Sequence, residues 1–156
     1  MSIRAADMMT SPVISVMEET GVAEIAALLS AKHISAVPVC RPDGTLAGIV
    51  SEGDVLRPFR ESVRQRRDWW LGIISEGETL SQEYLDYVRR DTHTAKEIMA
   101  TFVITADESA TLPELAESML KHAVKRIPIL RNGRLVGIVS RADLIESIAR
   151  APAMLV

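Results

Sequence analysis

The sequence predicts a mixed α/β (α+β) fold made of two tandem β-α-β-β-α motifs packed with pseudo-two-fold symmetry, plus a helical insert. Three observations support this prediction: the chain repeats itself, each copy has the same order of apolar patterns, and a segment without a counterpart separates the copies. We therefore divide the 156 residues into a first motif at 1–58, an insert at 59–94 and a second motif at 95–156.

The internal repeat is visible when the sequence is compared with itself. A shift of 90 residues aligns Met9 with Met99 and Pro38 with Pro128. One residue is then lost in a turn, and residues 48–51 align with residues 137–140, both reading GIVS. A single gap and an identical block of four residues indicate a duplicated unit.

Each copy opens with a short extended run, at residues 13–16 and 103–105, and an amphipathic helix follows. The apolar positions of each helix recur at a spacing that forms one buried stripe. Pro113 lies near the start of the second helix, where its missing N–H costs little. The stripe residues are Val22, Ile25, Ala26, Leu28 and Leu29 in the first copy, and Leu112, Leu115, Ala116 and Met119 in the second.

A β-hairpin and a second helix complete each copy. Strands are predicted at 36–39 and 46–50 and at 127–130 and 135–139, joined by turns that contain Asp43-Gly44 and Asn132-Gly133. Ser51 and Ser140 are good N-cap residues for the helices that follow. A unit of about 50 residues buries too little apolar surface to be stable alone, so we expect the two copies to pack against each other.

The insert at 59–94 is predicted to be helical and contains both tryptophans and both tyrosines of the chain, Trp69, Trp70, Tyr84 and Tyr87. One helix continues from Asp54 towards residue 74, and another covers residues 80–90. Adjacent helical residues project about 100° apart, so one tryptophan can be buried while the other stays available. Packing, a dimer interface and a specific partner site all remain open for this pair.

The composition restricts the class of protein. Apolar residues make up 47% and charged residues 25% of the chain, as in globular proteins, and the only cysteine, Cys40, excludes a disulfide scaffold. No apolar run approaches the ~18 residues of a membrane span, and the first residues do not resemble a signal peptide. We therefore expect a soluble cytoplasmic protein. A net charge of −3 and only 4% aromatic residues argue against nucleic acid as the main partner.

Several segments resemble the CBS domain family, whose tandem pairs are called Bateman modules. In the first copy these are residues 7–10 (DMMT), 35–38 (SAVP) and 48–54 (GIVSEGD); in the second they are 97–99 (EIM), 125–128 (KRIP) and 137–143 (GIVSRAD). The resemblance covers about two thirds of the chain. The insert, with RRDWW at 66–70, resembles a subfamily of bacterial stand-alone CBS pairs.

The resemblance implies a regulatory module and not an enzyme. CBS pairs bind adenosine-containing ligands such as AMP, ADP, ATP, NAD or S-adenosylmethionine in clefts between the two repeats, and binding changes the conformation of an attached or partner protein. The family also implies a flat homodimer in which the second helix of each repeat often contributes to the interface. Because the sequence shows no effector domain, we expect an unidentified partner protein to receive the signal.

The chemistry of a nucleotide site can also be argued from the residues. Asp54 and Asp143 each follow, by three positions, a serine that opens a helix. A carboxylate accepts two hydrogen bonds and suits the vicinal diol of a ribose, while a serine hydroxyl and helix N-terminal N–H groups suit a phosphate. The same Ser-x-x-Asp pattern is typical of a capping box, which is the purely structural alternative.

The family resemblance groups the candidate ligand-binding residues into two pockets. We expect the pocket of Asp143 to have the more complete adenosine half, and the pocket of Asp54 to depend more on charge, with Glu52 as an unfavourable neighbour. A solvated strand end is the alternative for Lys125 and Arg126. The first pocket combines Ser51 and Asp54 with Val103, Thr105, Lys125 and Arg126; the second combines Ser140, Arg141 and Asp143 with Thr10, Val13, Ser15, Ile34, Ser35 and Ala36.

Other chemically reactive residues have simpler explanations. His33 and His122 lie near the ends of equivalent helices, where a cation is favoured, and we predict no metal site. Cys40 follows an apolar strand and is predicted to be a buried, inert thiol. A constitutive dimerisation or assembly module with vestigial pockets is the main functional alternative, and RNA binding is a further one.

Overall fold

The computed structural model describes residues 3–61 and 93–155, and its contacts divide the chain into two compact units. Unit 1 comprises Met1–Ser15, Cys40–Leu46 and Phe102–Val156, and unit 2 comprises Val16–Val39 and Ala47–Thr101. Each unit has its own hydrophobic core. In the described ranges, no helix is both long enough and apolar enough to cross a membrane.

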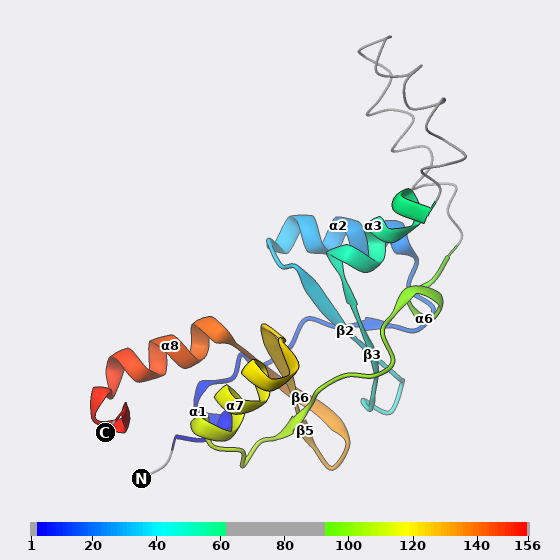
Figure 1. The fold of residues 1–156 in the computed structure, drawn as a ribbon. Helices are drawn as coiled ribbons and strands as arrows, with labels where there is room; N and C mark the ends of the chain where they lie inside the picture. The colour runs from blue at the N-terminus through cyan, green and yellow to red at the C-terminus, as the bar shows by residue number, and fades with distance from the viewer. Residues whose placement is uncertain (1–2, 62–92, 156) are drawn as a thin grey trace, which may run out of the picture. The chain divides into compact units, whose positions relative to one another are not determined.

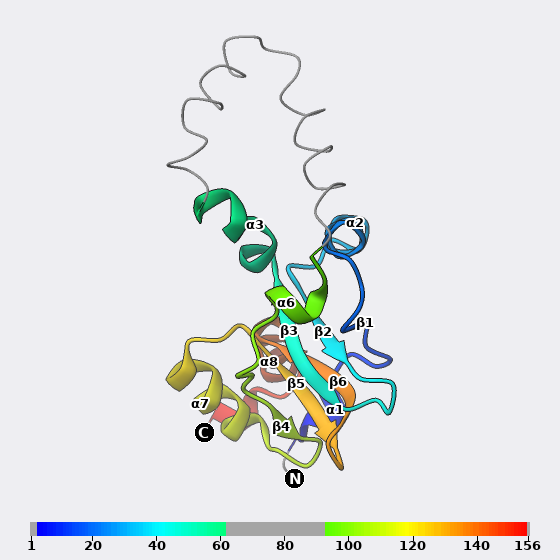
Figure 2. The same ribbon diagram turned by 90° about the vertical axis from the view of Figure 1, so that its right-hand side faces the viewer.

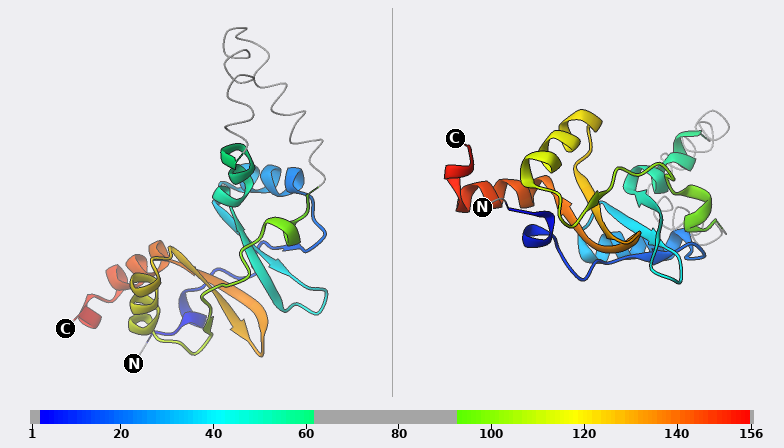
Figure 3. Two further views of the ribbon diagram at one scale, coloured as in Figure 1. Left: turned by 45° about the vertical axis from the view of Figure 1, so that its right-hand side comes forward. Right: turned by 90° about the horizontal axis from the view of Figure 1, so that it is seen from below.

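Unit 2 is built on a three-stranded sheet with the order β1-β2-β3, and helices α2 and α3 lie side by side (Figures 1 and 3). Val22, Ile25 and Leu29 are buried on one face of α2, as the helical spacing of the apolar residues requires. The elements are β1 (Val16–Met17), α2 (Val22–Lys32), β2 (Ala36–Cys40), β3 (Leu46–Ser51), α3 (Glu52–Glu61) and α6 (Ala95–Ile98).

Unit 1 repeats this arrangement with the sheet β4-β5-β6, and α7 packs against both β5 and α8 (Figure 2). Strand β4 is parallel to β5, and β5 is antiparallel to β6. Asn132 and Gly133 have φ values of 52° and 79°, which match the backbone twist that a tight hairpin requires. The elements are α1 (Ala5–Met8), β4 (Ala106–Asp107), α7 (Leu112–His122), β5 (Arg126–Arg131), β6 (Arg134–Ser140), α8 (Arg141–Arg150) and η1 (Pro152–Leu155).

The first segment of each repeat packs within the unit of the other repeat. In unit 1, the N–H of Ala5 donates to the carbonyl of Ala110 at 2.8 Å; in unit 2, the N–H of Ala95 donates to the carbonyl of Thr20 at 2.8 Å. Both alanines are fully buried in the cores. Helix α1 thus belongs to the sheet of the second repeat and α6 to the sheet of the first (Figures 1 and 2).

The predicted fold class and the β-α-β-β-α order are confirmed in both copies, and the hairpin turns lie where the sequence places them. The first strand of each copy is shorter and later than expected. Only β1 and β4 pair with a neighbouring strand. Among the described residues, the extended runs at 13–15 and 103–105 that precede them form no ladder. Helix α3 enters the predicted insert as far as Glu61. The remaining predictions for the insert, including those on Trp69, Trp70, Tyr84 and Tyr87, concern residues outside the described ranges.

Candidate functional site

The two helix starts that were predicted to bind a ligand have the same local geometry. The Ser140 hydroxyl accepts a hydrogen bond from the N–H of Asp143 at 3.2 Å, and the Asp143 carboxylate accepts one from the N–H of Ser140 at 2.8 Å. The corresponding distances between Ser51 and Asp54 are 3.3 and 2.8 Å. Both serines therefore cap their helices as predicted, and each pair forms a reciprocal capping box.

A backbone hydrogen bond ties each helix start to the residue immediately before the neighbouring strand. The N–H of Glu52 donates to the carbonyl of Ser35 at 2.9 Å, and the N–H of Arg141 donates to the carbonyl of Lys125 at 3.0 Å. Ser35 and Lys125 occupy equivalent positions in the two repeats. This repeated bond fixes the first turn of α3 and of α8 relative to its own sheet.

The two carboxylates differ in how fully their oxygens are used. Asp54 Oδ2 accepts from both the N–H and the hydroxyl of Ser51, and Asp54 Oδ1 accepts from Arg57 Nη2 at 2.6 Å. The Asp54 side chain is 7% exposed. Asp54 is therefore a buried carboxylate whose hydrogen-bonding capacity is largely satisfied within its own helix start.

Asp143 is less enclosed. It is only partly buried, and its Oδ2 accepts from Ser140. No described residue donates a hydrogen bond to Asp143 Oδ1. This oxygen and the exposed Arg141 beside it give the start of α8 an acceptor and a cation.

Two further predicted residues lie close to the start of α8 within unit 1. Thr10 forms an antiparallel bridge with Ile138, two residues before Ser140, with N–H to carbonyl distances of 2.9 and 3.2 Å. Arg126 is the direct partner of Ser140 in the β5–β6 ladder. Thr10 was predicted to belong with Ser140, whereas Arg126 was predicted to belong with Asp54.

The grouping of the other candidate residues into two pockets stays a prediction, because each predicted pocket draws on both units. Ser15 has an additional contact, since its side chain hydrogen-bonds with Cys40 in unit 1. Lys125 is exposed, immediately before β5. Unit 1 contains Val13, Ser15, Val103, Thr105 and Lys125, and unit 2 contains Ile34, Ser35 and Ala36.

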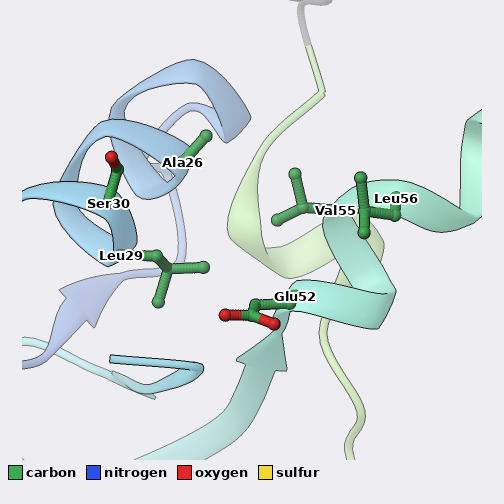
Figure 4. Close-up of a pocket in the computed structure, with 6 residues that line it drawn as sticks. All are labelled: Ala26, Leu29, Ser30, Glu52, Val55 and Leu56. Atoms are coloured by element: carbon green, nitrogen blue, oxygen red, sulfur yellow. The ribbon is translucent and has the colours of Figure 1, made fainter. Parts of the chain in front are cut away.

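Unit 2 also contains a pocket between α2 and α3 that the sequence did not predict (Figure 4). Its volume of about 230 Å³ is smaller than the ~300–1,000 Å³ of typical ligand pockets. Figure 4 shows the Glu52 carboxylate directed between the two helices. The walls offer no cation to a phosphate, so this pocket does not fit a nucleotide; they are formed by Ala26, Leu29, Ser30, Glu52, Val55 and Leu56.

Arg57 is the residue at this site that the sequence reasoning missed. The signal was available, because residues three apart on a helix lie close together and an Asp–Arg pair at that spacing forms an ion pair. The equivalent position in the second repeat is Glu146, which pairs with Arg150 and not with Asp143. The two helix starts therefore differ in the residue that follows the aspartate by three positions.

His33, His122 and Cys40 lie where the sequence predicts them. His33 is the left-handed C-cap of α2, and His122 is the last residue of α7. In the described part of the chain, no cluster of three His, Cys, Asp or Glu side chains could hold a metal ion. Cys40 is buried as predicted, and burial raises the pKa of its thiol, while the hydrogen bond with Ser15 partly offsets this rise in pKa.

Comparisons with known proteins confirm the resemblance seen in the sequence. The CBS domain family model matches residues 5–61 and 95–150. The CBS domain of a CBS domain-containing membrane protein from Sphaerobacter thermophilus is 30% identical, with a TM-score of 0.70, over 93% of this chain and 87% of that one.

Two solved CBS structures with bound ligands share the fold. CBSX2 in complex with AMP has 22% identity and a TM-score of 0.72, over 96% of this chain and 98% of that one. The CBS domain pair of protein MJ0100, in complex with 5′-methylthioadenosine and S-adenosylmethionine, has 22% identity and a TM-score of 0.69 over the same shares. With two matched motifs that cover most of its length, the chain belongs to the CBS domain family.

Proposed function

We propose that the chain is a regulatory module that binds an adenosine-containing nucleotide, such as AMP, ADP, ATP or NAD, and signals its presence to a partner protein. The observation that carries this proposal is the start of α8, where Asp143 Oδ1 has no donor among the described residues and lies beside a capped helix N-terminus. The AMP complex of CBSX2 and the methylthioadenosine complex of the MJ0100 domain pair support an adenosine-type ligand.

The chemistry assigns a role to each group at the start of α8. A ribose diol donates its hydroxyl hydrogens, and a carboxylate is the acceptor that suits a vicinal pair of them. The positive end of the helix dipole favours a phosphate. Arg141 adds a fixed fork of donors that matches phosphate oxygens, and Arg126 supplies a second cation, since it lies opposite Ser140 in the sheet.

The proposal assigns no catalysis to the chain. Cys40, the only thiol, is buried, and the raised pKa keeps it protonated and therefore poorly nucleophilic at neutral pH. CBS domains act in general as regulatory modules. The homodimer and the cytoplasmic location expected from the sequence belong to the same proposal.

A constitutive assembly module is the second candidate, and one observation favours it. Leu120 and Ile145 on α7 and α8 are 77% and 66% exposed, and Leu56 on α3 is 52% exposed. Contiguous exposed apolar surface marks protein–protein contacts, and such contacts are what an assembly module would make of these side chains. An assembly module with vestigial pockets would use these faces without responding to a nucleotide.

Thermal unfolding of the full chain in the presence of AMP, ATP, NAD or S-adenosylmethionine separates the two functions. A ligand that binds only the folded state stabilises it by about 2.7 kcal/mol at a concentration of 100 times Kd. We expect at least one of these ligands to raise the Tm of the wild-type chain, and Asp143→Ala to reduce that increase. An unchanged Tm with all four ligands would contradict the proposal and favour the assembly module.

A further inference from the structure

The two helix starts are alike in sequence and capping, yet only one aspartate is held by an arginine. Arg57 Nη2 donates to Asp54 Oδ1 at 2.6 Å, and this arginine follows Asp54 by three positions on α3. Glu146 occupies the equivalent position on α8 and accepts a hydrogen bond from Arg150, one turn further along. The repeat thus places a cation on one candidate carboxylate and an anion at the matching position of the other.

The hydrogen-bond capacity of the two carboxylates differs accordingly. An ionised carboxylate offers about four lone-pair sites. Asp54 uses two on Oδ2 for Ser51 and at least one on Oδ1 for Arg57, and its side chain is only 7% exposed. Asp143 uses Oδ2 for Ser140, and its Oδ1 accepts nothing from the described residues.

The Arg57 contact is strong compared with what a ribose offers. A guanidinium and a hydroxyl both donate charge-assisted hydrogen bonds to an ionised carboxylate, but only the guanidinium also brings an opposite charge. A diol that approaches Asp54 must displace Arg57 from Oδ1 and leave a nearly buried carboxylate without its cation, which is costly. At Asp143 the same diol meets an oxygen without a donor in the described residues.

We propose that Arg57 is an internal competitor that closes the Asp54 site to a ribose, so that the chain holds one adenosine nucleotide, at Asp143. This inference rests on the proposed function and adds the stoichiometry and its cause. Arg57 acts as a specificity-determining residue, because it occupies the acceptor that defines a ribose site. The second motif binds the nucleotide. In the first motif, the carboxylate at the helix start is already hydrogen-bonded to Ser51 and Arg57.

The number of AMP molecules bound by the full chain tests the inference. Equilibrium dialysis and calorimetry on the wild-type chain are expected to give one AMP per chain, Asp143→Ala none, and Arg57→Ala two. The double variant Arg57→Ala, Asp143→Ala is expected to bind one AMP, at Asp54. Two molecules bound to the wild-type chain, or one bound to Arg57→Ala, would overturn the inference.

A reciprocal variant keeps the test decisive if Arg57→Ala destabilises the fold. Glu146 is 60% exposed, so Glu146→Arg is tolerated and places an arginine three positions after Asp143. We expect Glu146→Arg to weaken AMP binding at least tenfold, while the control Glu146→Gln leaves it unchanged. Equal affinity in a folded Glu146→Arg chain would contradict competition by an arginine. Absence of AMP binding in every variant would instead contradict the proposed function.

Discussion

The side chain of Met9 lies directly against Gly137, so closely that a Cβ on this glycine would stand 2.2 Å from Met9 Sδ and 2.9 Å from Met9 Cβ. Met9 comes from the first segment of the first repeat, and Gly137 lies on β6 of the second. The glycine is therefore required by close packing. It allows the segment around α1 to pair with β6 in unit 1.

Gly137→Ala is expected to destabilise the chain by about 1–3 kcal/mol, the usual cost of overpacking a core. Because all three close atoms belong to Met9, Met9→Ala should relieve part of that cost. Urea unfolding of the two single variants and the double variant measures the coupling, which we expect to be about 1 kcal/mol and favourable. Strictly additive effects would show that Met9 is not what opposes the alanine.

Gly48→Ala is expected to destabilise the chain at least as much as Gly137→Ala. Truncating the neighbouring methionine should restore less of the lost stability. A Cβ at Gly48 would meet the Ala100 carbonyl oxygen at 2.6 Å as well as Met99 Sδ at 2.7 Å. Met99→Ala removes only the second of these contacts, so the double variant should remain strongly destabilised. If Met99→Ala restored as much unfolding free energy to Gly48→Ala as Met9→Ala restores to Gly137→Ala, the Ala100 carbonyl would not be what opposes the alanine.

Gly53→Ala provides a matched control on α3. A Cβ there meets only Ser51 Oγ at 3.6 Å, an ordinary contact distance. Alanine also loses less conformational entropy than glycine in a helix. We therefore expect this substitution to raise the unfolding free energy by about 0.5 kcal/mol, in contrast to the two strand glycines.

Much of this fold could be predicted because the signals are local. The apolar stripe of α2, the hairpin turn at Asn132-Gly133 and the serine caps all follow from residue types within a few positions. The exchange of α1 and α6 between the units could not be predicted. Met9 and Met99 are equivalent in the repeat, as are Gly48 and Gly137, so the sequence does not specify which methionine packs on which glycine.

The candidate site could likewise be predicted only in part. The positions of Asp54 and Asp143 on the first turn of a helix follow from the Ser-x-x-Asp spacing, and the structure confirms this placement. The difference in hydrogen bonding between them depends on the side-chain conformations of Arg57 and Glu146. The three-residue spacing makes an ion pair possible, but only the structure shows that Arg57 pairs with Asp54.

Cys40 is expected to be unreactive in the folded chain. Burial raises its thiol pKa above the ordinary value of 9.0, so little thiolate is present at neutral pH. A thiol reagent at pH 8 should modify it only as fast as the chain unfolds, and denaturant should restore ordinary reactivity. Ser15→Ala removes the hydrogen bond that lowers the pKa, so the thiol pKa should rise further in this variant. Fast labelling of the native chain would contradict burial of the thiol.

The Glu108–Arg131 pair predicts a pH dependence at acid pH. Arg131 donates to both carboxylate oxygens of Glu108, at 2.7 and 2.6 Å, and this holds the pKa of Glu108 below its ordinary value of 4.5, although neighbouring Asp107 opposes the shift. A carboxyl group with a lowered pKa in the folded state stabilises the fold above its unfolded pKa. That contribution is lost as the pH falls through the folded pKa.

Glu108→Gln should therefore have a lower Tm than the wild-type chain near neutral pH, with a difference that shrinks below pH 4.5. A carbon-detected NMR titration of the Glu108 carboxyl checks the cause directly. In Arg131→Ala the pKa of Glu108 should move back up toward its ordinary value. An unchanged pKa in that variant would show that Arg131 is not responsible.

The assignment of Asp143 to a ribose is tested most directly by comparing AMP with 2′-deoxy-AMP on the wild-type chain and on Asp143→Ala. A site that hydrogen-bonds both hydroxyls loses about 1.4 kcal/mol or more, a tenfold change in Kd, when one hydroxyl is removed. We predict that the wild-type chain binds AMP with a Kd about tenfold lower than that for 2′-deoxy-AMP. Asp143→Ala should bind both nucleotides weakly and with equal affinity. An equal affinity of the wild-type chain for both nucleotides, or an undiminished preference in Asp143→Ala, would contradict the account.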